Sequence, residues 1–228
     1  MTIFKFALMK GLRNPLNLLF SCIMPIVLIF IRPLWVEGFT LGYGLLIMAI
    51  GGGAFLMAQS ILTDKTSGAI NRILSTPVTM TNYLIQNLLA FMVPLIAQIL
   101  LVSVLGTALY SWSVEFGLAF FLCFSVFTIA SVTLGFALNC LLKHKESSFT
   151  ALGFLLVFGS FLSGFFIPLE QLPVPVQYAG TVFPSYWAFR GITYLLSDGV
   201  VTEYWLALLP MVIFTGIYLL YGGKRRII

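Results

Sequence analysis

The chain has 228 residues, of which 60% are hydrophobic and only 8% are charged, and its formal net charge is +5. Soluble domains carry about 25% charged residues, so this composition excludes an ordinary globular domain and indicates a helical membrane protein. The positive charge does not indicate nucleic-acid binding, because the basic residues cluster at the ends of apolar segments. We expect an all-α integral membrane fold in a single domain that spans residues 1–228.

Residues 1–14 form the first distinct piece of the chain. Apolar residues recur there at helical spacing beside basic residues that can reach lipid phosphates: Phe4, Leu8 and Leu12, with Lys5, Lys10 and Arg13. This pattern predicts a short helix in the inner membrane interface, before Pro15 turns the chain into the bilayer. The alternative is that the segment is only the basic flank of the first spanning helix.

Six segments are long and apolar enough to cross a membrane, which takes about 20 residues. They run over residues 16–36, 41–62, 83–110, 116–142, 147–167 and 204–221. With the N-terminus inside, ten basic residues lie on the cytoplasmic side: Lys5, Lys10, Arg13, Lys65, Arg72, Lys143, Lys145, Lys224, Arg225 and Arg226. Only Arg32 and Arg190 lie outside, so the positive-inside rule predicts six transmembrane helices with both termini in the cytoplasm.

The inner loop of residues 63–82 is polar, but it keeps apolar residues in the i, i+3, i+4 pattern of an amphipathic helix: Ile70, Ile73 and Leu74. Thr66 or Ser67 would cap this helix, and Pro77 would end it. An isolated helix of about two turns is unstable in water, so it needs the bilayer or another protein to rest on. Its other side would offer polar contacts from two residues: Asn71 and Arg72.

The outer segment of residues 168–203 is too apolar for a solvated loop. Prolines divide it into pieces too short to span the bilayer: Pro168, Pro173, Pro175 and Pro184. Aromatic residues in and just before it suit the membrane interface: Phe165, Phe166, Tyr178, Phe183, Tyr186 and Trp187. We expect a re-entrant hairpin of two short helices between the fifth and sixth spanning helices, with protein covering their free backbone groups.

The sequence offers no chemistry typical of an enzyme. It contains no GxxxxGK[ST] motif for nucleotide phosphates, and its single histidine, His144, lacks the partners of a metal site or a catalytic triad. The spans also lack an ionisable residue at mid-depth, which is the usual mark of ion-coupled transport. Uncharged polar residues within the spans either bond between helices or line a pathway: Gln59, Asn87, Gln98 and Asn139.

Two stretches of the chain resemble the ABC-2 type permeases of ABC exporters. The run KTSGAINRILSTPVTMTNYL is similar to that family's Gly-Thr-Leu-Glu-Arg-Leu-Leu-x-Thr-Pro-Val-Ser pattern, through residues 68–74 and 76–79. The outer run matches a second block of the family through Gly164, Pro168, Leu172, Pro173 and the Phe183-Pro184 pair. The chain departs from the pattern where Ala69 replaces the family's Thr and Asn71 replaces its acid.

The resemblance implies a permease without a cofactor of its own, coupled to a separate ATP-binding subunit that carries ATP and Mg²⁺. The inner helix would be the coupling helix, docked on that subunit through Ser67, Gly68, Ile70, Asn71, Arg72, Ile73, Leu74 and Pro77. The outer hairpin would be the external gate, formed by Phe165, Phe166, Pro168, Pro173, Phe183 and Pro184. Two copies, or one copy and a related permease, would form the path of a half-transporter in a bacterial plasma membrane.

Two other classes of function remain as alternatives. A secondary transporter or channel without an ATPase would favour charged residues at depth and gives no reason for the patterned inner helix. A membrane-embedded enzyme or assembly factor would favour clustered His, Asp, Glu or Cys at one membrane face. The apolar, uncharged spans favour an exporter of a hydrophobic or amphipathic substrate, such as a peptide, a lipid or a drug.

Overall fold

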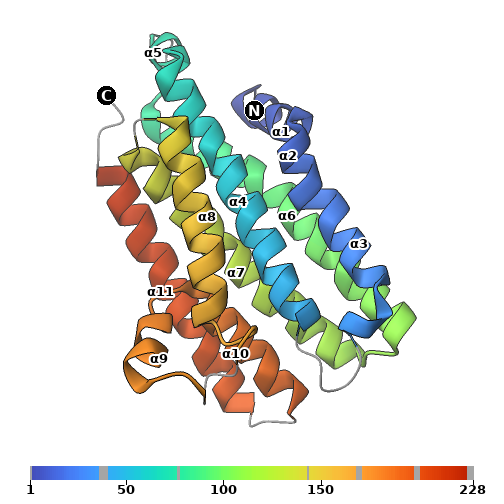
Figure 1. Cartoon of the computed structure of the whole chain (residues 1–228). Coiled ribbons are helices and arrows are strands. Elements are labelled where there is room, and N and C mark those ends of the chain that lie inside the picture. The colour runs from blue at the N-terminus through green and yellow to red at the C-terminus, as the bar shows by residue number, and fades with distance from the viewer. Residues whose placement is uncertain are drawn as a thin grey trace.

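The structure is a computed structural model of the chain, and it describes residues 2–35, 41–75, 78–142, 144–167, 171–197 and 201–224. Every regular element in these ranges is a helix (Figure 1). The expected all-α fold is therefore confirmed for the described residues.

The N-terminal part of the chain is divided by a sharp turn. Helix α1 (Thr2–Arg13) ends before Asn14, whose side chain accepts a hydrogen bond from the N–H of Leu16 at 3.1 Å and so caps α2 (Pro15–Leu18). Residues Ile3–Arg13 and Pro15–Phe30 meet at 83°. The helix predicted before Pro15 is present, and its position in the membrane interface stays a prediction.

The helix after this turn changes its winding. A π-helical turn, η1 (Leu19–Ile23), separates α2 from α3 (Met24–Phe30), and a 3-10 turn, η2, covers Arg32–Leu34. Pro25, at the start of α3, has no N–H to donate to the carbonyl four residues before it, so a regular α-helical bond is lost at this point.

Among the described residues, four helices are long and apolar enough to cross a membrane: α4 (Leu41–Thr66), α6 (Met80–Tyr110), α7 (Val114–Leu141) and residues Thr202–Tyr221 of α11 (Val201–Lys224). A fifth span is counted if the bent pair Ile3–Arg13 and Pro15–Phe30 is taken as one. Helix α8 (Lys145–Leu162) corresponds to the fifth predicted span, residues 147–167, but it ends five residues before that span does. Its first turn also carries two charged residues, Lys145 and Glu146. The predicted count of six spans therefore stays a prediction.

Helix α7 lies at the centre of the bundle and packs against α4, α6, α11 and α10 (Pro184–Leu196). Small residues bring these helices close together. A Cβ atom added to Gly135 of α7 would lie only 3.0 Å from the Cα of Phe55 in α4. One added to Gly52 of α4 would lie 2.9 Å from the ring of Phe20 in η1, so glycine at this position lets α4 and η1 approach closely.

Aromatic side chains close the ends of α3, α6 and α7 at one end of the bundle. The indole N–H of Trp35 donates to the carbonyl of Leu28, and the hydroxyl of Tyr110 donates to that of Ile29, both at 2.7 Å. The bond from Tyr110 satisfies the carbonyl of Ile29, because Pro33, four residues further on, has no N–H to donate. The carbonyl of Leu28 also accepts from the N–H of Ile31 at 3.2 Å. The rings of Trp35, Tyr110 and Trp112 also pack together, within 6.3 Å between centroids.

The bundle has two distinct ends (Figure 1). Helices α1 and α5 (Ala69–Leu74) lie at one end, which we call the α5 end. Helices α9 (Val174–Gly180) and α10 lie at the other, which we call the α10 end. Two short helices thus occupy the segment where the sequence predicts them, and their re-entry into the membrane stays a prediction.

A larger side chain at Gly135 should separate α7 from α4. We expect Gly135→Val to lower the stability of the purified protein by about 1 to 3 kcal/mol, because backbone atoms of α4 cannot move away cheaply. Gly153→Val is the control, since a Cβ at Gly153 would meet nothing within 4 Å. Thermal unfolding in detergent tests this, and equal melting temperatures for the two variants would contradict the close approach.

Candidate functional site

One carboxylate joins three helices at the α5 end. Asp64, near the end of α4, accepts a hydrogen bond from the hydroxyl of Tyr83 in α6 at 2.7 Å and forms an ion pair with Lys10 of α1. The ammonium of Lys10 also donates to the carbonyl of Ser60 at 3.3 Å. Tyr83 is 2% exposed and the side chain of Asp64 is 19% exposed, so the contact is largely shielded from water. We call these three side chains the Asp64 junction.

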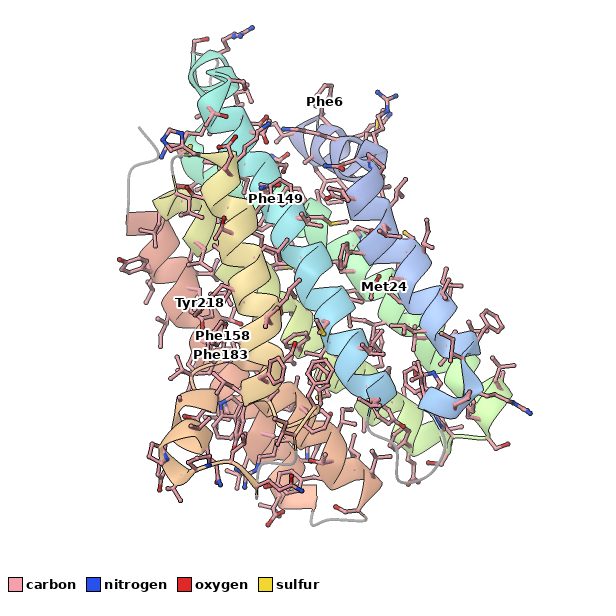
Figure 2. All side chains as sticks on the ribbon, in the orientation of Figure 1. Phe6, Met24, Phe149, Phe158, Phe183 and Tyr218 are labelled. Atoms are coloured by element: carbon pink, nitrogen blue, oxygen red, sulfur yellow. The ribbon has the colours of Figure 1, made fainter. Side chains whose placement is uncertain are left out.

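A second contact fastens the start of α1. The backbone N–H of Phe4, which has no partner within its own helix, donates to Oε1 of Gln86 in α6 at 3.1 Å. Lys10, expected to reach lipid phosphates, is therefore engaged within the chain, while Lys5 and Arg13 remain exposed. Phe6 is 73% exposed and projects from α1 away from the bundle (Figure 2).

Helix α5 forms where the apolar spacing predicts it. Gly68 connects it to α4 with a φ of +70°, a conformation that glycine adopts without strain. The hydroxyls of Thr66 and Ser67 donate to the carbonyls of Thr63 and Asp64 at 3.2 and 3.3 Å. They therefore satisfy the last turn of α4, which differs from the predicted role of capping α5.

The predicted docking residues of α5 fall into three groups. Ile70 is 3% exposed, in a buried cluster with Ala7 and Tyr83, and Ile73 packs against the same cluster. Ser67 and Arg72 are exposed. Pro77 and the side chains of Asn71 and Leu74 lie outside the described part of the chain. The surface on which Ile70 rests is therefore the chain's own.

The four polar residues proposed for a pathway are buried but separate. Asn139 donates to the carbonyl of Gly135 and accepts from Ser148 of α8 at 2.7 Å, which confirms an interhelical bond. Asn87 donates to the carbonyl of Tyr83 at 2.8 Å. In the described part of the chain, three of their side-chain atoms lack a hydrogen-bond partner: the amide oxygen and nitrogen of Gln98, and the amide nitrogen of Gln59. No hydrogen bond joins any two of the four within these residues.

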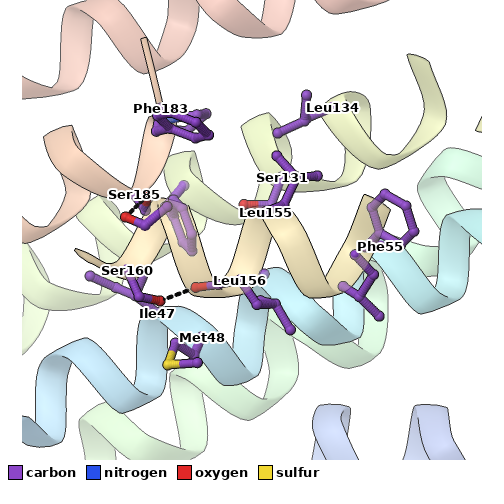
Figure 3. A pocket seen from close by; sticks show the side chains of 15 residues that line it. Ile47, Met48, Phe55, Ser131, Leu134, Leu155, Leu156, Ser160, Phe183 and Ser185 are labelled. Carbon is purple, nitrogen blue, oxygen red and sulfur yellow. Dashed lines mark hydrogen bonds between the residues drawn. The ribbon is translucent and has the colours of Figure 1, made fainter. Parts of the chain in front are cut away.

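An open pocket lies between α8 and the pair α4 and α7 (Figure 3). The space among its lining atoms is about 510 Å³ when open solvent at its mouth is counted. Most of its wall is apolar, with Phe55, Phe127 and Leu156 among the lining side chains. Three hydroxyls also line it: Ser131, Ser160 and Ser185. None of the four polar residues above contributes to this pocket.

Only two of the six predicted gate residues are known to line this pocket. Phe183 and Pro184 line it, whereas Phe165 is buried against Gly44 of α4. Phe166 is half-exposed, Pro173 is exposed, and Pro168 lies outside the described residues. Ser185 donates to the carbonyl of Gly159 at 3.2 Å and accepts from Ser163 at 2.8 Å, so the start of α10 is bonded to the end of α8.

Sequence reasoning missed the Asp64 junction and the hydroxyl of Ser131. Asp64 is the only acid between residues 63 and 82, which is a usable signal, but its partners come from distant parts of the chain. Within the described ranges, no three His, Cys, Asp or Glu side chains could hold a metal ion.

The sequence profile of a family described as ABC-2 family transporter protein matches residues 30–223. The match contains α4 to α10 and all but the last residue of α11, and therefore both of the stretches that carry the resemblance. Comparison with curated proteins gives no match.

Loss of the Asp64 charge should loosen α1. We expect Asp64→Asn to weaken the hold on α1 by about 1 to 2 kcal/mol, which would speed amide exchange in Thr2–Arg13 by roughly 5- to 30-fold. Glu146→Gln removes an exposed acid from the first turn of α8 and is the matched control. Unchanged exchange in Asp64→Asn would mean that other contacts hold α1.

Replacing a buried amide that lacks a hydrogen-bond partner and replacing one that has a partner should change the free energy of unfolding in opposite directions. Gln98→Met replaces an unpartnered amide with an apolar group of similar size, so we expect the free energy of unfolding to rise by about 1 kcal/mol. Asn139→Leu removes the acceptor of the Ser148 hydroxyl and should lower it by about 1 to 3 kcal/mol. Denaturation of both variants in the same detergent tests the contrast, and a lower stability of Gln98→Met would refute it.

Proposed function

Because the chain belongs to the ABC-2 family of transporter proteins and is therefore a membrane permease subunit of an ABC transporter, we propose that it is one half of an ATP-driven exporter. Permeases of this family work with an ATP-binding subunit. The α5 end would face the cytoplasm and meet that subunit, which would carry ATP and Mg²⁺. A second permease copy, identical or related, would complete the path.

The observation that carries this proposal is the way α5 is mounted at the end of α4. Its buried residue, Ile70, joins the cluster that contains parts of α1, α4 and α6, while Arg72 on the same helix is exposed. A partner that binds the exposed side would therefore pull on three helices together. This is the mechanical arrangement that a coupling helix needs, since packed helices transmit displacements as rigid bodies.

We also propose six membrane crossings, with the turn-containing segment of residues 15–34 as the first and α8 as the fifth. Both are shorter than the four long helices. The first segment carries one charged residue, Arg32, near the α10 end, and α8 ends there without a charged residue. A short crossing can be met by local thinning of the bilayer or by snorkelling of flanking basic residues, as Arg32 and Lys145 allow.

The substrate we propose is hydrophobic or amphipathic. The pocket beside α8 is walled mainly by aliphatic and aromatic side chains, and the start of α10, with Phe183 and Pro184, closes its outer end. Movement of α10 relative to α8 would open or narrow this end, so the α9–α10 segment would serve as the external gate. The direction of transport is proposed from the family.

Charge reversal on the exposed side of α5 should separate the two subunits. We expect Arg72→Glu to reduce co-purification of the ATP-binding subunit by at least tenfold, while the permease itself keeps its melting temperature, because Arg72 is exposed. Leu74→Asp should act in the same direction, since Leu74 belongs to the predicted docking stripe. Glu203→Lys, an equally large charge change at the α10 end, is the control.

If Arg72→Glu and Leu74→Asp both retain the ATP-binding subunit and normal transport, the assignment of α5 as the coupling helix fails. If no ATP-binding subunit accompanies even the unaltered chain, the exporter proposal itself fails.

A further inference from the structure

Arg190 of α10 is a charged side chain that is held by neutral partners. Its Nη1 donates to the hydroxyl of Tyr186 at 2.9 Å, and its Nε donates to the hydroxyl of Tyr194. Its Cζ atom lies 5.9 Å and 5.4 Å from the centroids of these two rings. The three residues occupy positions i, i+4 and i+8 and therefore share one face of the helix. We call these three side chains the Arg190 cluster.

The positive charge of this cluster has no counter-charge among the described residues. In that part of the chain the ion pair joins Lys10 and Asp64 at the α5 end, and no carboxylate pairs with Arg190. Phenol groups stabilise a guanidinium through hydrogen bonds and through their ring faces, but they are neutral and leave its charge in place. Arg190 is also exposed, so an anion from outside the chain can reach it.

The cluster has more hydrogen-bond donors than its internal bonds use. A guanidinium carries five N–H groups, and the two tyrosine hydroxyls accept from only two of those of Arg190. Each hydroxyl accepts in these bonds and so keeps its own proton to donate. Within the described residues, neither hydroxyl donates to a protein group. Unused N–H and O–H donors therefore lie beside an uncompensated positive charge.

The tyrosines hold the guanidinium in a defined orientation. Tyr186 is 5% exposed, and a Cβ atom added to Gly180 of α9 would lie 3.2 Å from its ring. Tyr194 is half-buried. Because the guanidinium bonds to two hydroxyls that are themselves packed, an anion that binds there orders the arginine side chain at little further entropic cost.

We propose that the Arg190 cluster binds the phosphate group of a molecule outside the chain. Arginine pairs well with phosphate, because the phosphate oxygens carry negative charge and accept several donors at once. The same chemistry is found in the headgroup of a phospholipid and in a free phosphate ion. The inference goes beyond the proposed function, because it concerns neither the pocket beside α8 nor the ATP-binding subunit.

The experiment observes Arg190 directly in the purified full chain, in a detergent that contains no phosphate. Arginine labelled with a nitrogen isotope gives side-chain Nε–H signals in NMR spectra, and Arg190→Lys identifies the signal of Arg190 by its loss. The additions are sodium phosphate, sodium acetate at equal ionic strength, phosphatidylglycerol, and a diacylglycerol with the same acyl chains but no phosphate.

We expect phosphate, phosphatidylglycerol or both to shift the Arg190 signal along a saturating curve, and the one that binds at lower concentration identifies the source. Acetate should bind at least about fivefold more weakly than the tighter of the two, because it offers fewer oxygens to the donors. Diacylglycerol should cause no saturable shift. Arg32, the other arginine at the α10 end, is exposed and lacks flanking tyrosine bonds among the described residues, so its signal is the internal control.

Two variants test the role of the tyrosines. Tyr194→Phe and Tyr186→Phe each keep the ring and remove one hydroxyl, so each should weaken binding of the phosphate-bearing ligand by roughly 3- to 10-fold. Tyr178→Phe removes the hydroxyl of a tyrosine of α9 that is 72% exposed, and as the matched control it should bind like the unaltered chain. Because Tyr194 is less buried than Tyr186, Tyr194→Phe stays informative even if Tyr186→Phe fails to fold.

Three results would each overturn the proposal: no saturable shift of the Arg190 signal with phosphate or phosphatidylglycerol, an equally strong response to acetate, or unchanged binding in Tyr194→Phe. An equal response of the Arg32 signal would also overturn it, because it would show attraction to any exposed arginine. None of these results bears on the exporter proposal, whose test uses Arg72 and Leu74 at the α5 end.

Discussion

The carboxylate of Asp64 holds the α5 end together, because it is the point at which α1, α4 and α6 meet. A negative charge in the last turn of a helix is disfavoured by the helix dipole. The ammonium of Lys10 and the hydroxyl of Tyr83 offset this cost, and in doing so they fix α1 against the other two helices. The buried cluster that receives Ile70 contains residues of the same three helices and of α7. The mounting of α5 therefore depends on a charge contact that lies beyond α5 itself.

Hydrogen-bond satisfaction in a water-free environment explains the rest of the architecture. At three departures from regular helix, side chains bond to backbone groups: Asn14 at the turn into α2, Trp35 and Tyr110 at the end of α3, and Thr66 and Ser67 at the end of α4. Against this background, the few buried polar groups without partners stand out. Both amide atoms of Gln98, which is buried in the bundle, are among them within the described residues.

Sequence patterns predicted the elements better than their partners. The spacing of Ile70 and Ile73 predicts α5 correctly, because the pattern records that one face is covered, but it does not record what covers it. Lys10 illustrates the same limit, since a basic side chain on an interfacial helix reaches a lipid phosphate or a protein carboxylate equally well. The early end of α8 was also missed, because the apolar residues continue past Leu162 while Gly164, with a φ of +88°, turns the chain. The pocket depends on packing between distant segments, which no local pattern contains.

The α9–α10 segment carries many of its own hydrogen bonds, and this bears on how the chain is inserted during synthesis. Gln177 donates to the carbonyl of Leu172, Trp187 to that of Thr181, and the hydroxyl of Thr181 to that of Tyr178, all between residues close in sequence. Such bonds form as soon as the segment emerges, before α11 is made. Bonds of this local kind leave the segment with fewer free backbone carbonyls before it packs against the long helices, which lowers the cost of burying it.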